Sequence, residues 1–206
     1  VGTGNHVLDI GCSTGEFASQ LKKQGNTIVG IDILPAKEIA PDIDKYIEMD
    51  LNQIPDDLQK VLDGQTFDKV IMADILEHLI KPETILQQTR QLLAPKGRLI
   101  VSLPNIANIT VRLNLLLGRF TYSDRGILDS THLHFYTLAT AKKLFHENGF
   151  RVILHRSSNM PVERALGIRR RPRFFSGLLA MGTRCFPRLL GFQHVFVLEQ
   201  KEARQP

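Results

Sequence analysis

Two short segments carry the side chains best suited to moving a proton. Asp74-x-x-Glu77-His78 follows an apolar run, and His132 and His134 lie in the segment STHLHFYT. Histidine is the usual base near neutral pH, and a neighbouring carboxylate can orient it. If the first segment is helical, Asp74 shares a face with Glu77 and His78, because residues three and four apart are neighbours on a helix. We therefore expect Glu77, His78 and His132 to form a catalytic group, with His134 as a further candidate.

Three interpretations of this group stay open. The side chains could act as a base and its orienters, they could hold a divalent cation, or they could only stabilise the turn in which they lie. A structural role is the simpler interpretation for the histidines of expected strands and helices, which are His6, His146, His155 and His194.

The N-terminal stretch HVLDIGCSTGEF, residues 6–17, reads as a strand, a loop of small residues and the start of a helix. Gly11 allows a tight turn after the strand, and Gly15 lets the helix begin close to a bound ligand. In open α/β sheets, ligands bind beyond the carboxyl ends of the strands. Asp32, at the end of the next expected strand, is therefore placed to bind a ribose diol.

The charges around this loop favour a cationic ligand over a pyrophosphate. A dinucleotide site requires G-x-G-x-x-G, but here the third position is Ser13 and the sixth is Glu16. Asp9 adds a second negative charge, and carboxylates repel a pyrophosphate. S-adenosylmethionine has a ribose for Asp32, an ammonium for Asp9 and no phosphate, so we predict it as the cofactor. A nicotinamide-dependent oxidoreductase is the alternative.

Alternating strand and helix patterns position these groups. They predict a doubly wound, Rossmann-like α/β sheet of seven strands, mostly parallel with an antiparallel last strand. The expected strands are 6–10, 27–32, 45–48, 67–72, 97–102, 150–156 and 192–199. The expected helices are 15–24, 55–62, 82–93, 106–117 and 138–148.

One domain is expected over residues 1–206. Residues 1–104 would form the cofactor-binding half, 105–149 an acceptor-site lid and helix, and 150–206 the last two strands with a basic insert at 157–191. Apolar residues of 106–117 recur with helical spacing, which suggests either a lid over the acceptor pocket or a packing helix. Asn105, just before this run, is expected near the pocket.

Several motifs together resemble the class I S-adenosylmethionine-dependent methyltransferases. VLDIGCSTGEFASQL resembles their first motif, IVGIDI the second-strand motif, and EMDLNQ the loop beside the adenine. FDKVIMADILEHLIKPETIL and LLAPKGRLIVSLPN resemble the fourth- and fifth-strand motifs. The resemblance covers residues 6–156. It implies a cofactor-binding role for Asp9, Gly11, Ser13, Gly15, Asp32, Ile33, Asp50, Leu51 and Ala73.

The resemblance also bears on metal binding. An E-x-x-E-H arrangement with a distant histidine binds metal in some methyltransferase families that modify vicinal oxygens. Asp74 replaces the first glutamate here and shortens its reach, so we assign no metal site. In such enzymes a helix ahead of the first strand often helps to close the site. Because the chain begins at Val1 without a methionine, we expect that helix to be missing from this sequence.

Residues 103–137 resemble a bacterial subgroup associated with cell-surface polysaccharide and lipid-linked glycan assembly. This likeness implies O-methylation of a sugar, glycan or lipid-linked intermediate, with a histidine as base. Some chains of this family type act as accessory or regulatory partners of biosynthetic enzymes, so a non-catalytic protein is a second alternative.

Charge is unevenly distributed along the chain. Residues 1–150 hold 15 basic and 18 acidic residues, whereas residues 151–206 hold 11 and 3. Arginines and apolar residues mix in 169–190, which resembles an interfacial helix at an anionic membrane. A helical cover with solvated arginines is the alternative, and nucleic acid is a weaker one. Two distant cysteines and no membrane-spanning run lead us to expect a cytoplasmic protein, peripheral to a membrane through 169–190.

Overall fold

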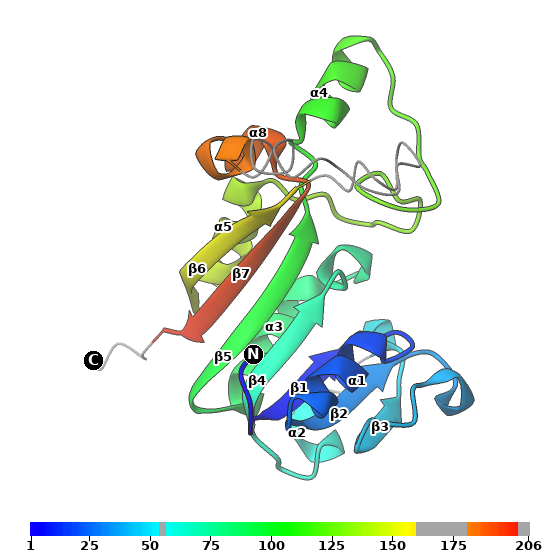
Figure 1. Cartoon of the computed structure of the whole chain (residues 1–206), viewed down its shortest axis with the longest axis vertical. Coiled ribbons are helices and arrows are strands. Elements are labelled where there is room, and N and C mark those ends of the chain that lie inside the picture. Colours follow the sequence, from blue (N-terminus) through cyan, green and yellow to red (C-terminus); the bar gives the residue numbers. More distant parts are fainter. Residues whose placement is uncertain (54–56, 160–180, 202–206) are drawn as a thin grey trace.

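In the computed structural model, seven strands form one sheet in the order β3-β2-β1-β4-β5-β7-β6 (Figure 1). The structure describes residues 1–53, 57–159 and 181–201. Neighbouring strands from β3 to β5 are parallel, and β7 runs antiparallel to both of its neighbours, which confirms the predicted sheet. The strands are β1 (His6–Ile10), β2 (Thr27–Asp32), β3 (Lys45–Glu48), β4 (Phe67–Ala73), β5 (Leu93–Pro104), β6 (Phe150–Ser158) and β7 (Gln193–Gln200).

Helices cover both faces of the sheet. On one face α1 packs on the parallel strands through Ala18 and Leu21, and on the other α3 and α5 contribute to a larger apolar cluster. The helices are α1 (Glu16–Lys23), α2 (Leu58–Val61), α3 (Pro82–Leu92), α4 (Ile109–Leu116), α5 (Leu138–Glu147) and α8 (Pro187–Leu190). Three 3-10 turns add η1 (Ala36–Glu38), η2 (Leu51–Gln53) and η3 (Leu76–His78).

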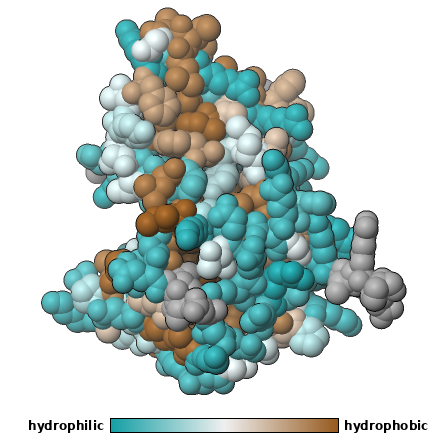
Figure 2. Space-filling view, turned by 180° about the vertical axis from the view of Figure 1, so that it is seen from behind, coloured by the Kyte–Doolittle hydropathy of each residue, from teal (hydrophilic) through white to brown (hydrophobic). Residues whose placement is uncertain are grey.

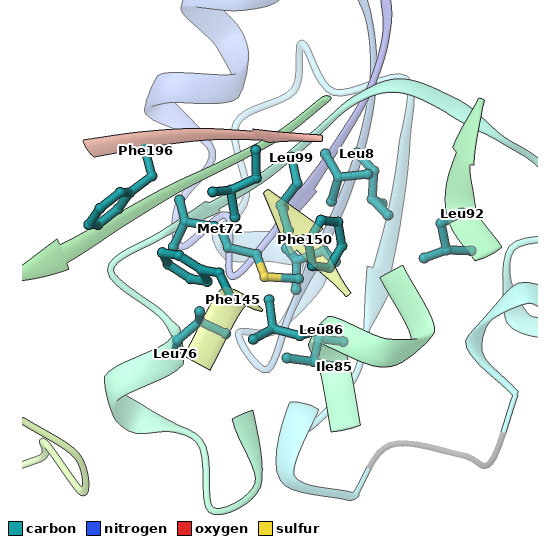
Figure 3. Packing of buried hydrophobic residues seen from close by; sticks show 14 of the residues in the cluster. Leu8, Met72, Leu76, Ile85, Leu86, Leu92, Leu99, Phe145, Phe150 and Phe196 are labelled. Carbon is teal, nitrogen blue, oxygen red and sulfur yellow. The ribbon is translucent and has the colours of Figure 1, made fainter. Parts of the chain in front are cut away.

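The main core lies between the sheet and α3 and α5 (Figure 3). Phe145 of α5 packs edge-on against Phe196 of β7, with ring centroids 5.0 Å apart, and both rings are fully buried. Alternate residues of β5 point into this core, among them Leu99 and Leu103. Burial of these side chains holds the carboxyl ends of β1, β2, β4 and β5 at one edge of the sheet.

One expectation for the chain after β5 is wrong. The helix begins at Ile109 rather than 106, because the Asn108 side chain caps it by accepting from Thr110 N at 3.0 Å. Asn105 is fully buried, its side chain donates to Gly191 O at 2.8 Å, and its backbone N–H donates to Phe192 O at 3.0 Å, so it joins two chain segments. Its neighbour Pro104 and its partner Phe192 both line a cavity, so Asn105 lies near a pocket as expected. Beyond this junction α4 stands out from the body of the molecule (Figure 1).

Candidate functional site

The loop after β1 has the backbone that its glycines predicted. Gly11 has a φ of 77°, and a Cβ there would lie 2.7 Å from the Ile75 side chain. Ser13 has a φ of 50°, and its N–H donates to Asp32 Oδ2 at 2.7 Å. Gly15 caps α1 in a left-handed conformation, packed against Ile43. Asp32 thus ties the loop after β1 to the end of β2, and the strand order reverses on the other side of β1, between β1 and β4.

Two cavities, one at this loop and one at the end of β2, hold eight of the nine predicted cofactor residues. A cavity of about 330 Å³ is lined by Asp9, Gly11, Ser13 and Ala73, among others. A second of about 150 Å³ is lined by Asp32, Ile33, Asp50 and Leu51, among others. Gly15 is the exception, since it starts the helix. The structure therefore brings the predicted residues together in two groups, as the separate ends of one elongated ligand would require.

The electrostatics of these cavities suit a cation. Glu16 lines the first cavity beside Asp9, and none of the described residues around either cavity is Lys or Arg. Burial, and to a lesser extent the charge of Asp32, raises the pKa of Asp9 from 3.8 to about 7. A cationic ligand would favour the ionised carboxylate, whereas a pyrophosphate would meet only repulsion.

An adjoining cavity of about 410 Å³ holds the predicted catalytic group. Glu77, His78 and His132 line it, together with Asp74 and Asp129. His78 also lines the cavity of Asp32 and Asp50. The two spaces are therefore neighbours, as the sites for a cofactor and its acceptor must be.

Glu77 is fully buried, and neither of its carboxylate oxygens has a hydrogen-bond partner among the described residues. Burial is the main cause that raises its pKa from 4.5 to about 8, and the nearby Asp74 and Asp129 add to it. The Glu77 carbonyl accepts hydrogen bonds from Leu133 N at 2.8 Å and His134 N at 3.1 Å. These bonds join η3 to the segment that carries His132. A buried carboxylate without a partner is costly, which points to a ligand at this position.

His132 presents an unprotonated nitrogen to this carboxylate. Its Nδ1–H donates to Ile127 O at 3.2 Å, so Nε2 is left with a lone pair, 4.0 Å from Glu77 Oε1. Burial, and then the charge of His78, lowers the pKa of His132. The imidazole is therefore neutral near pH 7, as a general base must be.

His78 is oriented by a short relay. The Thr131 hydroxyl donates to Asp129 Oδ1 at 2.7 Å, so it can only accept from His78 Nδ1–H at 3.1 Å. Nε2 of His78 is then the nitrogen with a free lone pair. The His78 and His132 rings meet edge-on, with centroids 4.8 Å apart.

Asp74 lines the same cavity, as expected, but not from a shared helical face, and His134 does not line it. Asp74 is not on a helical face with Glu77, because it has a left-handed backbone with φ of 53°, and only Leu76–His78 is helical. Its carboxylate accepts from Ser102 Oγ at 2.9 Å and from the Gln193 side chain, although it lines the same cavity. His134 approaches Ile80 O at 3.4 Å and does not line the cavity.

The cavity also contains residues that the sequence analysis missed. Phe192 and Gln193 reach it from β7 and the turn before it, and Asp129 lines it beside the relay through Thr131. The D-S-T order of residues 129–131 is typical of a side-chain-capped turn, which was the available signal for Asp129 and Thr131. No sequence pattern around Gln193 identifies it as a residue of this cavity, because its partner Asp74 is 119 residues away.

Glu77, His78 and His132 could also hold a divalent cation. One ligand atom from each lies within 4.8 Å of the others, and carboxylate and imidazole suit several divalent metals. The unpartnered Glu77 carboxylate fits this role as well as it fits a substrate. No metal site was assigned from the sequence because the side chain of Asp74 is shorter than the glutamate of the metal-binding pattern. Asp74 is not one of the three possible ligands here, so that argument no longer applies.

A larger cavity, about 980 Å³, lies at the other end of the sheet around Arg98 and Glu199. It faces the amino end of β5, and none of the described residues that line it is a histidine. Ligands of open α/β sheets bind at the carboxyl ends of the strands. The candidate functional site is therefore the group of cavities beside Asp9, Asp32 and Glu77.

The family model of a methyltransferase domain matches residues 2–155. Among curated proteins, the mitochondrial ubiquinone biosynthesis O-methyltransferase of Homo sapiens is 27% identical over 157 residues, 72% of this chain and 42% of that protein. The ubiquinone biosynthesis O-methyltransferase of Pasteurella multocida is 31% identical over 50% of this chain and 48% of its own length. The chain thus spans less than half the length of these relatives.

Solved structures share the fold. A SAM-dependent methyltransferase from Archaeoglobus fulgidus superimposes with a TM-score of 0.62 and 18% identity, over 97% of this chain and 87% of that one. The 1,6-didemethyltoxoflavin-N1-methyltransferase of Burkholderia thailandensis, with S-adenosylhomocysteine bound, gives 0.59 and 14% over 97% and 72%.

Proposed function

Since the chain belongs to the methyltransferase domain family, we propose that it transfers a methyl group from S-adenosylmethionine to a hydroxyl oxygen of an acceptor. The observation that carries this proposal is the group of Glu77, His78 and His132 in a cavity adjoining the cofactor cavities. The two alternatives from the sequence, a nicotinamide-dependent oxidoreductase and an accessory protein, have no comparable support.

Different residues bind the cofactor and accept the proton during methyl transfer. Asp9 would bind the ammonium of the cofactor, and Asp32 its ribose. The acceptor hydroxyl gives its proton to Nε2 of His132, and its oxygen attacks the methyl carbon in line as the carbon–sulfur bond breaks. S-adenosylhomocysteine leaves, and the proton remains on His132 until solvent takes it. Glu77, 4.0 Å from that nitrogen, has a pKa of about 8, and its ionised form stabilises the imidazolium.

A divalent cation is compatible with the same residues. Held by Glu77, His78 and His132, it would lower the pKa of an acceptor hydroxyl. Chelation followed by readdition of magnesium, manganese or zinc separates this arrangement from a metal-free base. Loss and recovery of transfer would assign the cation, and unchanged transfer would assign His132 as the base.

Two acceptor classes are in contention. The relatives named ubiquinone biosynthesis O-methyltransferases favour a hydroxyl on an intermediate of that kind. The likeness of residues 103–137 to a polysaccharide-associated subgroup favours a sugar hydroxyl of a glycan or lipid-linked intermediate. Both supply a hydroxyl group, which the cluster requires.

A direct test uses S-adenosylmethionine labelled in its methyl group. Polyprenylated phenols and catechols, sugar nucleotides and lipid-linked sugars are offered to the wild type, Glu77→Gln, His132→Ala and the control His134→Ala. We expect one class to be labelled, with loss of at least about 100-fold in the first two variants only. Equal binding of S-adenosylhomocysteine by all four would place the loss in the chemical step. Cofactor binding without transfer to any acceptor would instead favour the accessory protein.

A further inference from the structure

The α4 end, defined as residues 112–122 together with 181–190, exposes a concentration of apolar side chains. Every residue from 112 to 126 is exposed, and Val111 is the one buried residue of α4. Leu116 is 83% exposed and Leu117 68%. The other exposed apolar residues here are Leu113, Leu115, Phe120, Tyr122, Met181 and Phe186. Figure 2 shows hydrophobic residues gathered at this end of the molecule.

These side chains lie on more than one side of the helix. Successive residues of a helix are rotated by about 100°, so Leu113 and Leu116, three residues apart, share one side, whereas Leu115 points to nearly the opposite side from Leu113. Of the two roles expected for this segment, a packing helix does not agree with these exposed leucines, and a lid over the acceptor pocket stays a prediction. A groove on a protein partner covers one face of a helix, whereas lipid chains enclose a helix from several sides.

The charge of the α4 end has one sign. Residues 112–122 and 181–190 contain four arginines and no Asp or Glu. The arginines are Arg112, Arg119, Arg184 and Arg188. The two segments are joined, because the Asn105 and Asn108 side chains both donate to Gly191 O, at 2.8 and 2.9 Å. A surface of this composition complements an anionic headgroup layer.

Several polar groups of α4 and its flanking residues are hydrogen-bonded to one another. Asn114 Nδ2 donates to Thr110 O at 2.8 Å, and Arg112 Nε donates to Ala107 O at 2.7 Å. At the C-terminus, Arg119 N donates to Asn114 O at 2.8 Å, and Gly118 N donates to Leu115 O at 2.9 Å. Little hydrogen bonding with water is therefore lost when this end leaves the aqueous phase.

We propose that the α4 end docks on an anionic lipid bilayer, with its leucines among the acyl chains and its arginines at the headgroups. None of the helices in the described part of the chain has the length and apolar character to cross a membrane, so the contact is peripheral. Part of the segment expected from the sequence, 169–180, lies outside the described residues. The described surface instead places the contact on α4 and on residues 181–190.

Docking at this end would bring the acceptor site to the membrane surface. A cavity of about 200 Å³ beside α4 is lined by Thr110, Val111 and Asn114, and it shares Gly126 and Phe192 with the acceptor cavity. A lipid-linked acceptor could then approach from the bilayer. The docking itself does not depend on the proposed reaction.

Cosedimentation with lipid vesicles tests the proposal. The chain is mixed with vesicles of phosphatidylcholine alone or with a third of phosphatidylglycerol, and the bound fraction is measured. We expect the wild type to sediment with the anionic vesicles. Partitioning should fall by about 100-fold or more for Leu116→Asp/Leu117→Asp. It should fall by about fivefold for each of Arg112→Gln and Arg119→Gln. Ile153→Ser, an exposed apolar residue on the edge strand β6, is the matched control and should bind like the wild type.

Two results would overturn the proposal. One is a wild type that stays in the supernatant with both vesicle types. The other is equal sedimentation of the double leucine variant and the wild type. Sedimentation velocity provides a further test. If the wild type is a dimer and the double leucine variant is a monomer, this surface binds a second copy of the chain, and the proposal is overturned. Binding of S-adenosylhomocysteine by each variant shows that it is folded and is independent of the docking result.

Discussion

The buried Glu77 carboxylate should make the fold less stable as the pH rises. Its pKa is raised from 4.5 to about 8, mainly by burial. Between these values the folded protein holds a proton that the unfolded chain has released, so the free energy of unfolding falls with pH by about 1.4 kcal/mol per unit. Over the full window this amounts to about 5 kcal/mol. This loss of stability is absent below pH 4.5 and complete above pH 8.

Glu77→Gln removes this titration while nearly preserving the shape of the side chain. We expect the variant and the wild type to differ little at pH 5, and the variant to be more stable at pH 9 by up to about 5 kcal/mol. Urea unfolding at half-unit steps between pH 5 and 9, followed by circular dichroism, measures the difference. Other groups titrate in both proteins and therefore cancel in the comparison.

Glu83→Gln provides the control, because Glu83 lies on the exposed side of α3. Its stability should follow the wild type at every pH. A difference between Glu77→Gln and the wild type that does not change with pH would refute the reasoning. It would mean that the carboxylate is solvated or paired in solution. If a divalent cation binds there, adding it at pH 9 should stabilise the wild type and leave Glu77→Gln unchanged.

Three further predictions concern the cofactor loop and the relay. S-adenosylmethionine affinity should fall about tenfold per pH unit below pH 7, because Asp9, with a pKa of about 7, must be ionised to bind a cation. Calorimetry on Asp9→Asn should find weak binding that does not change with pH. Thr131→Val should lower kcat about tenfold by removing one acceptor of His78 Nδ1–H, and Thr131→Ser should restore it, with unchanged cofactor binding in both. Gly11→Ala should cost about 2 kcal/mol or more in thermal unfolding, since the φ of 77° and the Ile75 contact at 2.7 Å both oppose a Cβ.

The sheet could be predicted because its signals are local. Runs such as HVLDI and TIVGID are apolar and bounded by turn residues, and each forms a strand with the expected limits. The cofactor residues could also be placed, since parallel strands bring their carboxyl ends to one edge. Position along a strand was enough to bring Asp9 and Asp32 together.

The acceptor cavity was harder to predict because it depends on contacts between distant segments. Glu77 and the segment that carries His132 are joined by hydrogen bonds across more than 50 residues, and only residue type suggested that they lie together. The position of Asp74 was wrong because its left-handed backbone ends β4 before any helix begins. For α4, periodicity predicted a buried face, but whether anything packs on that face is a tertiary property.

The same physical cause raises the pKa values of two carboxylates. Asp9 and Glu77 are both buried, and burial is the largest cause of each shift. Each also lines a cavity in which the proposed reaction places positive charge, the cofactor ammonium beside Asp9 and the imidazolium or a cation beside Glu77. The charge that destabilises the empty fold would then become favourable when ligands bind. Ligand binding should therefore raise the unfolding temperature most above pH 8, where both groups are ionised, and least at pH 5, where both hold their protons.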